Sequence, residues 1–317
     1  MVHHHDGRPL PRPDEDLEDQ GLGFDVGTLL QRRRVLQAFG IGAMSLGLAA
    51  CSSATGASSS STAATSSGEI PDETAGPYPG DGSNGPDVLE ESGIVRSDIR
   101  SSFGDASATA EGIPMTLTLN LKDLAQGGSA FAGVAVYVWQ CDREGRYSMY
   151  SSGVEDENYL RGVQIADSAG QVRFTSIFPA CYTGRWPHIH FEVYPDREGI
   201  QDSSNAIATS QVALPQDACD AVYATAGYAS SVKNLAGVTL AGDNVFGDDG
   251  GVHQLAQVTG SVKAGYQVSL TVGVDTGTEP TGGGAPAGGG GPGGGGPGEG
   301  GAPPNGGPGG EGTGTSG

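Results

Sequence analysis

The sequence predicts an all-β protein: an antiparallel β-sandwich with one small helical insert, flanked by disordered N- and C-terminal segments. Short runs that alternate apolar and polar residues recur between turn signals, which is the pattern of half-buried strands. Many short strands at such spacing are typical of a sandwich. Glycine is also unevenly spread, because 21 of the 56 glycines lie in residues 281–317. The globular part therefore lies between two ends of biased composition.

Strands are expected at five places in this globular part. Three runs alternate apolar and polar residues regularly. A fourth is rich in β-branched and aromatic residues, as expected of a strand buried on both faces, and the fifth is the last strand of the domain. Asp167–Gly170 forms a turn signal before one of them, and Pro195 ends another. In chain order the expected strands are 115–121, 134–139, 171–177, 188–194 and 266–274.

The single helical insert is expected at residues 215–223. Pro215 and the acidic Asp217 stand in its first turn. Proline and acidic residues are favoured there, because the first turn lacks intrahelical partners for its N–H groups. The segment is short, so we expect a surface helix.

Residues 1–51 have the features of an export signal. Arg32–Arg34 precede an uncharged run, 35–50, which is too short to span a membrane. The paired arginines resemble a twin-arginine signal, and Leu48–Cys51 resembles a lipobox. Cys51 is then either the lipidated first residue of the mature chain or a free thiol next to an ordinary cleavage site. We expect an exported protein, either a cell-surface lipoprotein or a secreted one, whose only membrane contact is lipid on Cys51.

Three further regions follow the signal. Residues 52–69 are mostly Ser, Thr, Ala and Gly and are expected to form a flexible linker. Residues 70–275 form the folded domain. The Gly/Pro-rich tail, 276–317, cannot repay the entropy of ordering and is expected to be disordered.

The charge of the domain argues against one class of partner. Residues 70–280 hold 11 basic and 27 acidic side chains, a net charge of −16, and no block of Lys or Arg. Binding along a phosphate backbone depends on clustered cations. We therefore expect no nucleic-acid partner.

Three cysteines remain if Cys51 carries lipid: Cys141, Cys181 and Cys219. In an oxidising compartment, an odd number suggests one disulfide and one free thiol. Three pairings are open. Cys181–Cys219 is favoured because both residues lie in loop or helix-start segments, whereas Cys141 closes a strand.

The most informative motif is His188-Ile189-His190. Residues i and i+2 of a strand point to the same face, so both imidazoles can reach one metal ion. The alternative is a pair of strand histidines bonded to their neighbours. His3–His5 would be removed with the signal, which leaves His253 as the only other histidine of the mature chain.

Two tyrosines are candidate further ligands. Tyr182 lies six residues before His188, and Tyr147 follows the strand that ends at Trp139. Tyrosinate is a hard anionic donor, so two phenolates with two imidazoles favour iron(III), whereas zinc prefers a different set. A tyrosine near a strand end often only packs, and that alternative stays open here.

Several of these motifs together resemble one family, the intradiol ring-cleavage dioxygenases, which includes the catechol 1,2- and protocatechuate 3,4-dioxygenases. The likeness spans about residues 70–275 and is nearest to the exported, single-domain branch. Glu73–Tyr78 resembles the substrate-pocket segment of the protocatechuate enzymes. The other motifs are Gly145–Ser148, Leu160–Gly162, Gly170–Pro179 and Tyr182-x-x-Arg185-x-x-His188-x-His190.

The resemblance implies a non-haem iron(III) centre. Tyr147 and His188 would be equatorial ligands of the iron, and Tyr182 and His190 would be its axial ligands. Hydroxide or water would be the fifth ligand, and a catechol-type substrate would bind through both oxygens and displace hydroxide and Tyr182. With O2 the ring would then open between its two hydroxyl-bearing carbons, giving a cis,cis-muconate-type product.

The resemblance also implies roles for residues around the metal. Arg185 would stabilise charge that develops on the ring, and Tyr182 and Gln211 would be the other catalytic residues. Thr74, Gly76, Pro77 and Tyr78 would contact substrate together with Arg185. The sequence does not separate catechol, hydroxyquinol, protocatechuate and larger lignin-derived catechols.

Two departures from the family pattern stand out. Cys181, directly before the axial tyrosine, suggests a loop tied by a disulfide. Residues 52–69 are low in complexity where the catechol-specific enzymes have a helical dimerisation domain, so the lipid-assisted dimer of that branch is not expected.

Three other protein classes are alternatives to a ring-cleaving dioxygenase. A copper–zinc superoxide dismutase needs about six histidines, more than the mature chain has. A cupin needs a glutamate shortly after the His-x-His motif, where this chain has Tyr194 and Pro195. A lipid-anchored β-sandwich that binds a ligand without catalysis is the remaining alternative, and it predicts a colourless protein.

Overall fold

The computed structural model describes residues 4–5, 8–9 and 68–283. The expected signal run, nearly all of the Ser/Thr-rich linker, Cys51 and most of the Gly/Pro-rich tail lie outside these residues. Strands β1 (His4–His5) and β2 (Arg8–Pro9) form a short antiparallel pair. No helix within the described ranges is long and apolar enough to cross a membrane.

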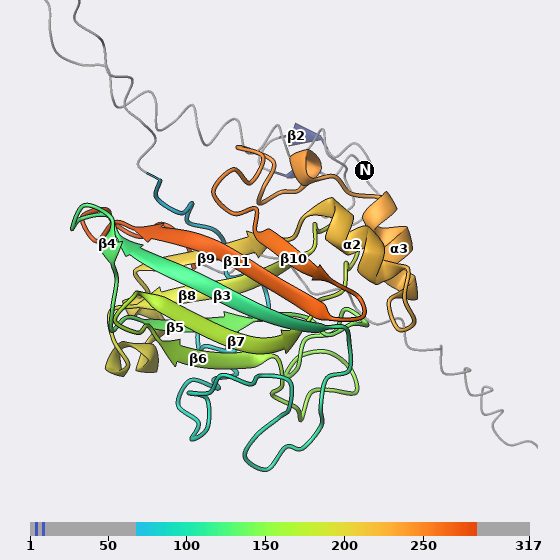
Figure 1. The fold of residues 1–317 in the computed structure, drawn as a ribbon, viewed down its shortest axis with the longest axis horizontal. Coiled ribbons are helices and arrows are strands. Elements are labelled where there is room, and N and C mark those ends of the chain that lie inside the picture. Colours follow the sequence, from blue (N-terminus) through green and yellow to red (C-terminus); the bar gives the residue numbers. More distant parts are fainter. Residues whose placement is uncertain (1–3, 6–7, 10–67, 284–317) are drawn as a thin grey trace, which may run out of the picture.

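The domain is built from two β-sheets that lie one behind the other in Figure 1. Their facing sides share one apolar core, to which β3 contributes Leu117 and Leu119, β5 contributes Val138, and β8 contributes Ile189 and Phe191. The first sheet contains β10 (Gln257–Ser261), β11 (Gly265–Val274), β3 (Pro114–Asp123) and β4 (Ser129–Ala130), with β7 (Gln171–Ile177) also paired to β3. The second has the order β6 (Arg161–Ile165), β5 (Ala135–Trp139), β8 (His188–Tyr194), β9 (Ala208–Ala213).

All five expected strands are present, but the expectation of a purely antiparallel arrangement is wrong. β11 runs parallel to β3, with Tyr266 beside Met115 and Val274 beside Asp123. A hairpin can join only antiparallel neighbours, whereas a long crossover leaves the direction of the returning strand open. The chain between β3 and β11 passes through the second sheet and the helices before it returns, so local pattern carried no information on this pairing.

The helical insert is larger than expected. Helix α2 (Gln216–Tyr223) lies where the sequence predicts it, but α3 (Ala229–Ala236) follows it and packs beside it. Helix α3 buries only Ser231 and Leu235. Residues 68–283 also form three short 3-10 turns: η2 (Glu198–Gln201), η3 (Ser203–Asn205) and η4 (Leu240–Gly242).

Strand β8 has a core face and a site face. All seven of its residues are buried, since β5 and β9 pair with it on either side and loops cover its outer face. Ile189, Phe191 and Val193 point into the core between the sheets. The alternation of a strand therefore places His188 and His190 together on the opposite face.

The expected Cys181–Cys219 disulfide is not formed. Cys141, Cys181 and Cys219 are all buried, free thiols. Each sulfur lies against a backbone carbonyl instead: Cys141 Sγ is 3.6 Å from Ala180 O, Cys181 Sγ is 3.4 Å from Arg185 O, and Cys219 Sγ is 4.0 Å from Leu214 O. The loop before Tyr182 is thus held by packing and hydrogen bonds, not by a covalent link.

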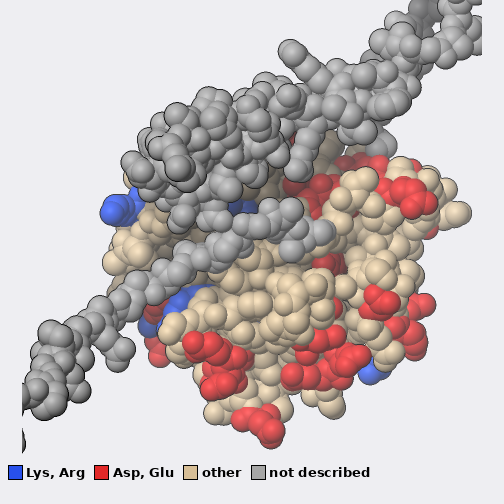
Figure 2. All heavy atoms as spheres, turned by 180° about the vertical axis from the view of Figure 1, so that it is seen from behind, with Lys and Arg blue, Asp and Glu red and all other residues tan. Residues whose placement is uncertain are grey.

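The first residues of the segment expected to be disordered, 276–283, bond back to the start of the domain. Thr278 Oγ1 donates to Glu69 Oε1 at 2.6 Å, Thr281 N donates to Asp72 Oδ2 at 2.6 Å, and Gly283 N donates to Glu73 O at 2.9 Å. Figure 2 shows acidic side chains spread over the described part of one face with few basic ones, as the negative charge count predicts.

Candidate functional site

Four predicted ligands meet on the outer face of the second sheet. His188 and His190 come from β8, Tyr182 from the loop before β8, and Tyr147 from the loop after β5. His188 Nε2 lies 3.1 Å from Tyr182 Oη and 3.1 Å from His190 Nε2. The ring of Tyr147 is centred 6.0 Å from that of Tyr182 and 6.3 Å from that of His190. Residues far apart in the sequence thus form one compact cluster.

The two imidazoles are held in fixed orientations. His188 Nδ1 lies 2.6 Å from Trp186 O, and a carbonyl can only accept, so Nδ1 carries the proton. Nε2 of neutral His188 is then left with a free lone pair, which is the tautomer that a metal ligand needs. The His190 ring stacks on Trp139 at 4.9 Å with an 8° interplanar angle.

Burial keeps all four groups uncharged when no cation is near them. Burial lowers the pKa of His188 and His190, and the positive charge of Arg185 lowers both further. Burial also raises the pKa of Tyr147 far above its ordinary value and that of Tyr182 to about 12. A cation placed among these groups would reverse the shift of the phenols, because it stabilises phenolate.

The cluster fits a hard metal ion by two observations. Two ligands that lie about 2.1 Å from one ion, at right angles to each other, are about 3 Å apart, close to the 3.1 Å separations seen here. Tyr147 Oη is buried and has no hydrogen-bond partner in the described part of the chain. A metal–oxygen bond would satisfy this atom, and two phenolates with two imidazoles suit iron(III).

The cluster also differs from common metal sites. Within residues 68–283, no group of three or more His, Cys, Asp or Glu side chains is placed to hold a metal ion. A metal bound at this cluster would therefore depend on the tyrosines for two of its protein ligands.

A tight turn projects Tyr147 into the site. The buried Asp142 accepts the backbone N–H groups of Glu144 and Arg146 with one carboxylate oxygen, at 3.0 and 2.9 Å. Gly145 inside this turn has φ +89°, and a Cβ there would lie 3.4 Å from Tyr182 Cβ. A glycine is therefore favoured where the two tyrosine loops approach each other.

The predicted substrate segment lies directly over the histidines. Gly76 has φ +73°, and a Cβ on it would lie 3.2 Å from His190 Cε1. Gly76 N donates to Thr74 Oγ1 at 3.0 Å, while Pro77 O accepts from Asn84 Nδ2 at 2.8 Å. Tyr78 stacks at a tilt against Tyr147, with ring centroids 5.0 Å apart. All four predicted residues of this segment, Thr74, Gly76, Pro77 and Tyr78, are thus next to the cluster or bonded within the segment that covers it.

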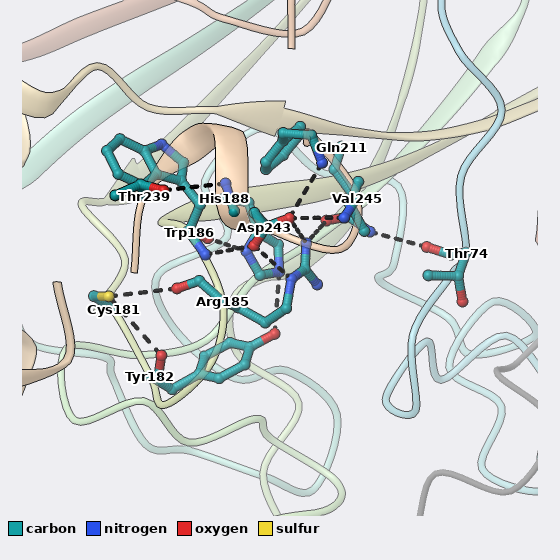
Figure 3. Close-up of polar contacts among 12 residues, drawn as sticks. Thr74, Cys181, Tyr182, Arg185, Trp186, His188, Gln211, Thr239, Asp243 and Val245 are labelled. Carbon is teal, nitrogen blue, oxygen red and sulfur yellow. Dashed lines mark hydrogen bonds and ion pairs between the residues drawn. The ribbon is translucent and has the colours of Figure 1, made fainter. Parts of the chain in front are cut away.

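Arg185 and Gln211 lie side by side, and Arg185 is close enough to Tyr182 to interact with it electrostatically. Arg185 Nη2 donates to Gln211 Oε1 at 2.7 Å, and Gln211 Nε2 donates to Thr74 O at 3.0 Å. Gln211 therefore links the arginine to the substrate segment (Figure 3). Arg185 also pairs with Asp243, at 3.0 Å from Nε to Oδ2. The sequence reasoning missed Asp243, because one aspartate in a Gly- and Asp-rich loop looks like a turn residue.

The sequence reasoning assigned no role to Arg161, although its motif was part of the resemblance. Its side chain is buried and uses all five of its N–H donors. Nε donates to Ser148 Oγ at 3.1 Å, Nη1 to Pro79 O at 2.6 Å and Tyr137 Oη at 3.0 Å, and Nη2 to Tyr78 O at 3.0 Å and Ser148 O at 2.9 Å. Arg161 thereby ties the substrate segment to the loop that carries Tyr147.

Part of this chain matches a known family model, and its fold is similar to those of solved structures. Residues 84–196 match the family model described as "Dioxygenase". An intradiol ring-cleavage dioxygenase from Tetranychus urticae aligns over 66% of this chain and 95% of its own, with 24% identity and a TM-score of 0.52, which shows a shared fold. The dioxygenase domain of a carbohydrate-binding fusion protein from Streptomyces sp. SirexAA-E (20% identity, 65% and 98% covered, TM-score 0.42) and catechol 1,2-dioxygenase from Pseudomonas arvilla C-1 (19%, 60% and 60%, 0.37) also align. The match over residues 84–196 and the shared fold agree with the resemblance to the intradiol ring-cleavage dioxygenases.

Proposed function

We propose that this protein is a non-haem iron(III) dioxygenase that opens a catechol-type ring between its two hydroxyl-bearing carbons with O2. The product would be a cis,cis-muconate-type diacid. One observation carries the proposal: Tyr147, Tyr182, His188 and His190 converge in a buried cluster whose donor atoms suit one hard trivalent ion. Iron(III) bound there would bind the catechol oxygens and draw electron density from the ring.

Of the two tyrosines, Tyr182 is the one that would be better placed to accept a proton from a bound substrate. Its side chain is partly exposed, whereas Tyr147 is 2% exposed. A catechol that binds through both oxygens loses two protons; Tyr182 Oη would accept one, and a hydroxide displaced by the substrate would accept the other. The ordinary preference of this phenol for its neutral form, shown by a pKa raised to about 12, favours that transfer once the cation no longer holds it.

Other residues would orient the ring and stabilise its charge. Arg185 presents a guanidinium group beside Tyr182, close enough for the two to interact electrostatically. Negative charge that develops on the ring during cleavage would be stabilised by this fixed cation in a site with little water. Gly76 allows the substrate segment to lie against His190, and Tyr78 adds an aromatic wall beside Tyr147.

The proposal has a direct spectroscopic test. Tyrosinate bound to iron(III) absorbs visible light, so the purified, iron-loaded mature protein should be red-brown. Tyr147→Phe or Tyr182→Phe should weaken or shift the band and abolish ring cleavage. Tyr223→Phe is the matched control, because Tyr223 is also buried but donates to Pro179 O away from the cluster. A colourless wild-type protein, or an unchanged band in Tyr147→Phe, would contradict the ligand set and favour the non-catalytic binding protein.

Substrate choice can be tested with the same preparation. Catechol, 1,2,4-benzenetriol and protocatechuate are each mixed with enzyme and O2, and formation of the conjugated diacid is followed by its ultraviolet absorbance. Ring opening between the hydroxyl-bearing carbons forms two new carboxyl groups on a conjugated product from any of them. Failure to cleave any catechol would reject the proposed reaction.

We also propose export, as a lipoprotein anchored through Cys51 or as a secreted protein. The support is the sequence of residues 1–51 alone. Cell fractionation of the wild type and of Cys51→Ala tests it, since loss of the lipid should move the protein from the membrane fraction to the medium or supernatant.

A further inference from the structure

Asp243 makes an unusually complete set of contacts beside the site. Its side chain is fully buried and its ion-pair partner Arg185 is 14% exposed. Oδ2 accepts from Arg185 Nε at 3.0 Å and from Trp186 N at 2.7 Å. Oδ1 accepts from Val245 N at 2.9 Å, Phe246 N at 3.2 Å and Arg185 Nη2 at 3.4 Å. The carboxylate is therefore fixed by the backbone on both sides, and it in turn fixes the arginine (Figure 3).

The charge on Asp243 is maintained by this pairing. Burial alone would raise the pKa of the carboxyl, but the neighbouring Arg185 and the hydrogen bonds outweigh it, so the pKa lies below its ordinary value. An ionised acceptor makes shorter and stronger hydrogen bonds than a neutral one. Asp243 thus acts as a fixed anion rather than as a group that exchanges protons.

The hydrogen bonds leave one end of the guanidinium available. Asp243 accepts hydrogen bonds from both Nε and Nη2 of Arg185. Gln211 accepts a second hydrogen bond from Nη2. Within the described part of the chain, Nη1 of Arg185 has no hydrogen-bond acceptor among its contacts. The same guanidinium interacts electrostatically with both phenols, Tyr182 more strongly than Tyr147.

We propose that Asp243 is a positioning residue for Arg185: it orients the guanidinium so that Nη1 remains free to face the charge that develops on the substrate ring. This inference rests on the proposed ring-cleavage function. Asp243 acts through Arg185 and does not itself contact the reacting atoms. A purely structural role for Asp243, through its bonds to Trp186, Val245 and Phe246, is the alternative that an experiment has to separate.

A double-mutant cycle makes the separation. The wild type, Asp243→Asn, Arg185→Gln and the double variant are loaded with iron, and kcat and KM are measured with a catechol that the wild type cleaves. We expect Arg185→Gln to lower kcat by about 10²–10³-fold, as for loss of a fixed donor to a developing anion. Asp243→Asn should lower kcat about tenfold with a smaller change in KM, and the double variant should match Arg185→Gln alone. If the two effects multiply in the double variant, Asp243 does not act through Arg185 and the proposal is rejected.

Two further readouts exclude a merely structural effect. The visible absorption band should keep its position in Asp243→Asn, since no ligand is changed. In the metal-free full-length chain, the Arg185 Nε–H signal, identified by its absence in Arg185→Gln, should exchange with solvent at least about tenfold faster in Asp243→Asn. Unchanged exchange would show that Asp243 does not hold the arginine.

Should Asp243→Asn fail to fold, the same cycle is run with Asp243→Glu. This variant keeps the charge but moves the carboxylate by one methylene, so kcat should fall in the Arg185 background and stay unchanged in the Arg185→Gln background. An inactive, colourless wild type contradicts the proposed function itself. That outcome is distinct from failure of the inference, in which the wild type is coloured and active but the effects multiply.

Discussion

Arg161 and Arg185 both lie beside the candidate ligands, and both are largely buried, but their hydrogen bonds differ in kind. Arg161 donates all five N–H groups to carbonyl and hydroxyl oxygens. Arg185 is paired with the carboxylate of Asp243 and with Gln211, and its Nη1 is not used in this way. A cation whose donors are all occupied by protein can hold loops together but has nothing left for a substrate. The burial of an arginine therefore does not show whether its side chain can contact a substrate, whereas the number of its N–H donors not bonded to protein does.

The largest effect on stability is expected at Arg161. Arg161→Met leaves the carbonyl oxygens of Tyr78 and Ser148 without a donor and removes one of the two donors to Pro79 O, and each unsatisfied buried group costs about 1–3 kcal/mol. We expect the free energy of unfolding to fall by about 3 kcal/mol or more, with the melting temperature about 6–12 °C lower. Arg173→Met is the control, because Arg173 is exposed and makes one bond of 3.3 Å to Gln267. Equal melting temperatures for the two variants would show that the hydrogen bonds of Arg161 stabilise the fold no more than the single bond of Arg173.

A smaller effect, on rate rather than on stability, is expected at Arg185. Arg185→Lys keeps the charge and can keep the ion pair with Asp243, but it loses the planar group that Asp243 and Gln211 hold. We expect kcat to fall by about tenfold to a hundredfold, while the melting temperature stays within about 3 °C of the wild type. Steady-state kinetics and thermal unfolding measure the two. A kcat equal to that of the wild type would show that a point charge is enough at this position.

Glu192 gives a pH test of the Arg161 region. Burial, and then the nearby charge of Asp81, raises the pKa of Glu192 to about 8, and its partner is the Tyr194 hydroxyl at 2.8 Å. Because the folded state holds this proton more tightly than the unfolded state, the stabilisation is complete below about pH 4.5 and is lost as the pH rises towards 8. The loss is at most about 1.4 kcal/mol for each pH unit in that window.

The measurement is the free energy of unfolding in urea at pH 5, 6, 7 and 8. Glu192→Gln should flatten the pH dependence, and the exposed Glu90→Gln should leave it as in the wild type. A slope that is unchanged in Glu192→Gln would show that Glu192 is not the group that titrates.

The smallest effect is expected at Gln211. Gln211→Leu removes one of the two groups that hold Arg185 and also the bond to Thr74 O, while Asp243 keeps its contacts. Loss of one such bond is worth about 1 kcal/mol, so kcat should fall roughly fivefold. If Gln211→Leu lowers kcat more than Asp243→Asn does, the amide and not the carboxylate is the main support of Arg185.

The sequence predicted the parts of the site that depend on local geometry. His188 and His190 share a face because a strand alternates, and this follows from two residue numbers and the strand pattern. Tyr147 and Tyr182 were candidates because they border the ends of strands, and the family resemblance strengthened that choice. The strands at 171–177 and 188–194 have the predicted bounds for the same local reason.

The features that the sequence did not predict all depend on contacts between distant segments. Asp243 meets Arg185 across 58 residues, and nothing in its own loop distinguishes it from a turn aspartate. The thiols of Cys181 and Cys219 are free, and each lies against a backbone carbonyl, which no cysteine count can show. The parallel register of β11 on β3 likewise follows from the path of the whole chain.

The pairing of β3 with β11 also has a consequence for how the protein folds. β3 lies between β7 and β11. Because β11 follows the second sheet and both helices in the sequence, Met115 can pair with Tyr266 only after all of these residues have been synthesised. Contacts between residues so far apart in the sequence have a high entropic cost of loop closure, and this cost slows folding. A nascent chain that ends before β11 would expose the backbone of a long central strand, a surface prone to aggregation. β11 is the last strand of the described domain, and its pairing with β3 covers this backbone in the first sheet.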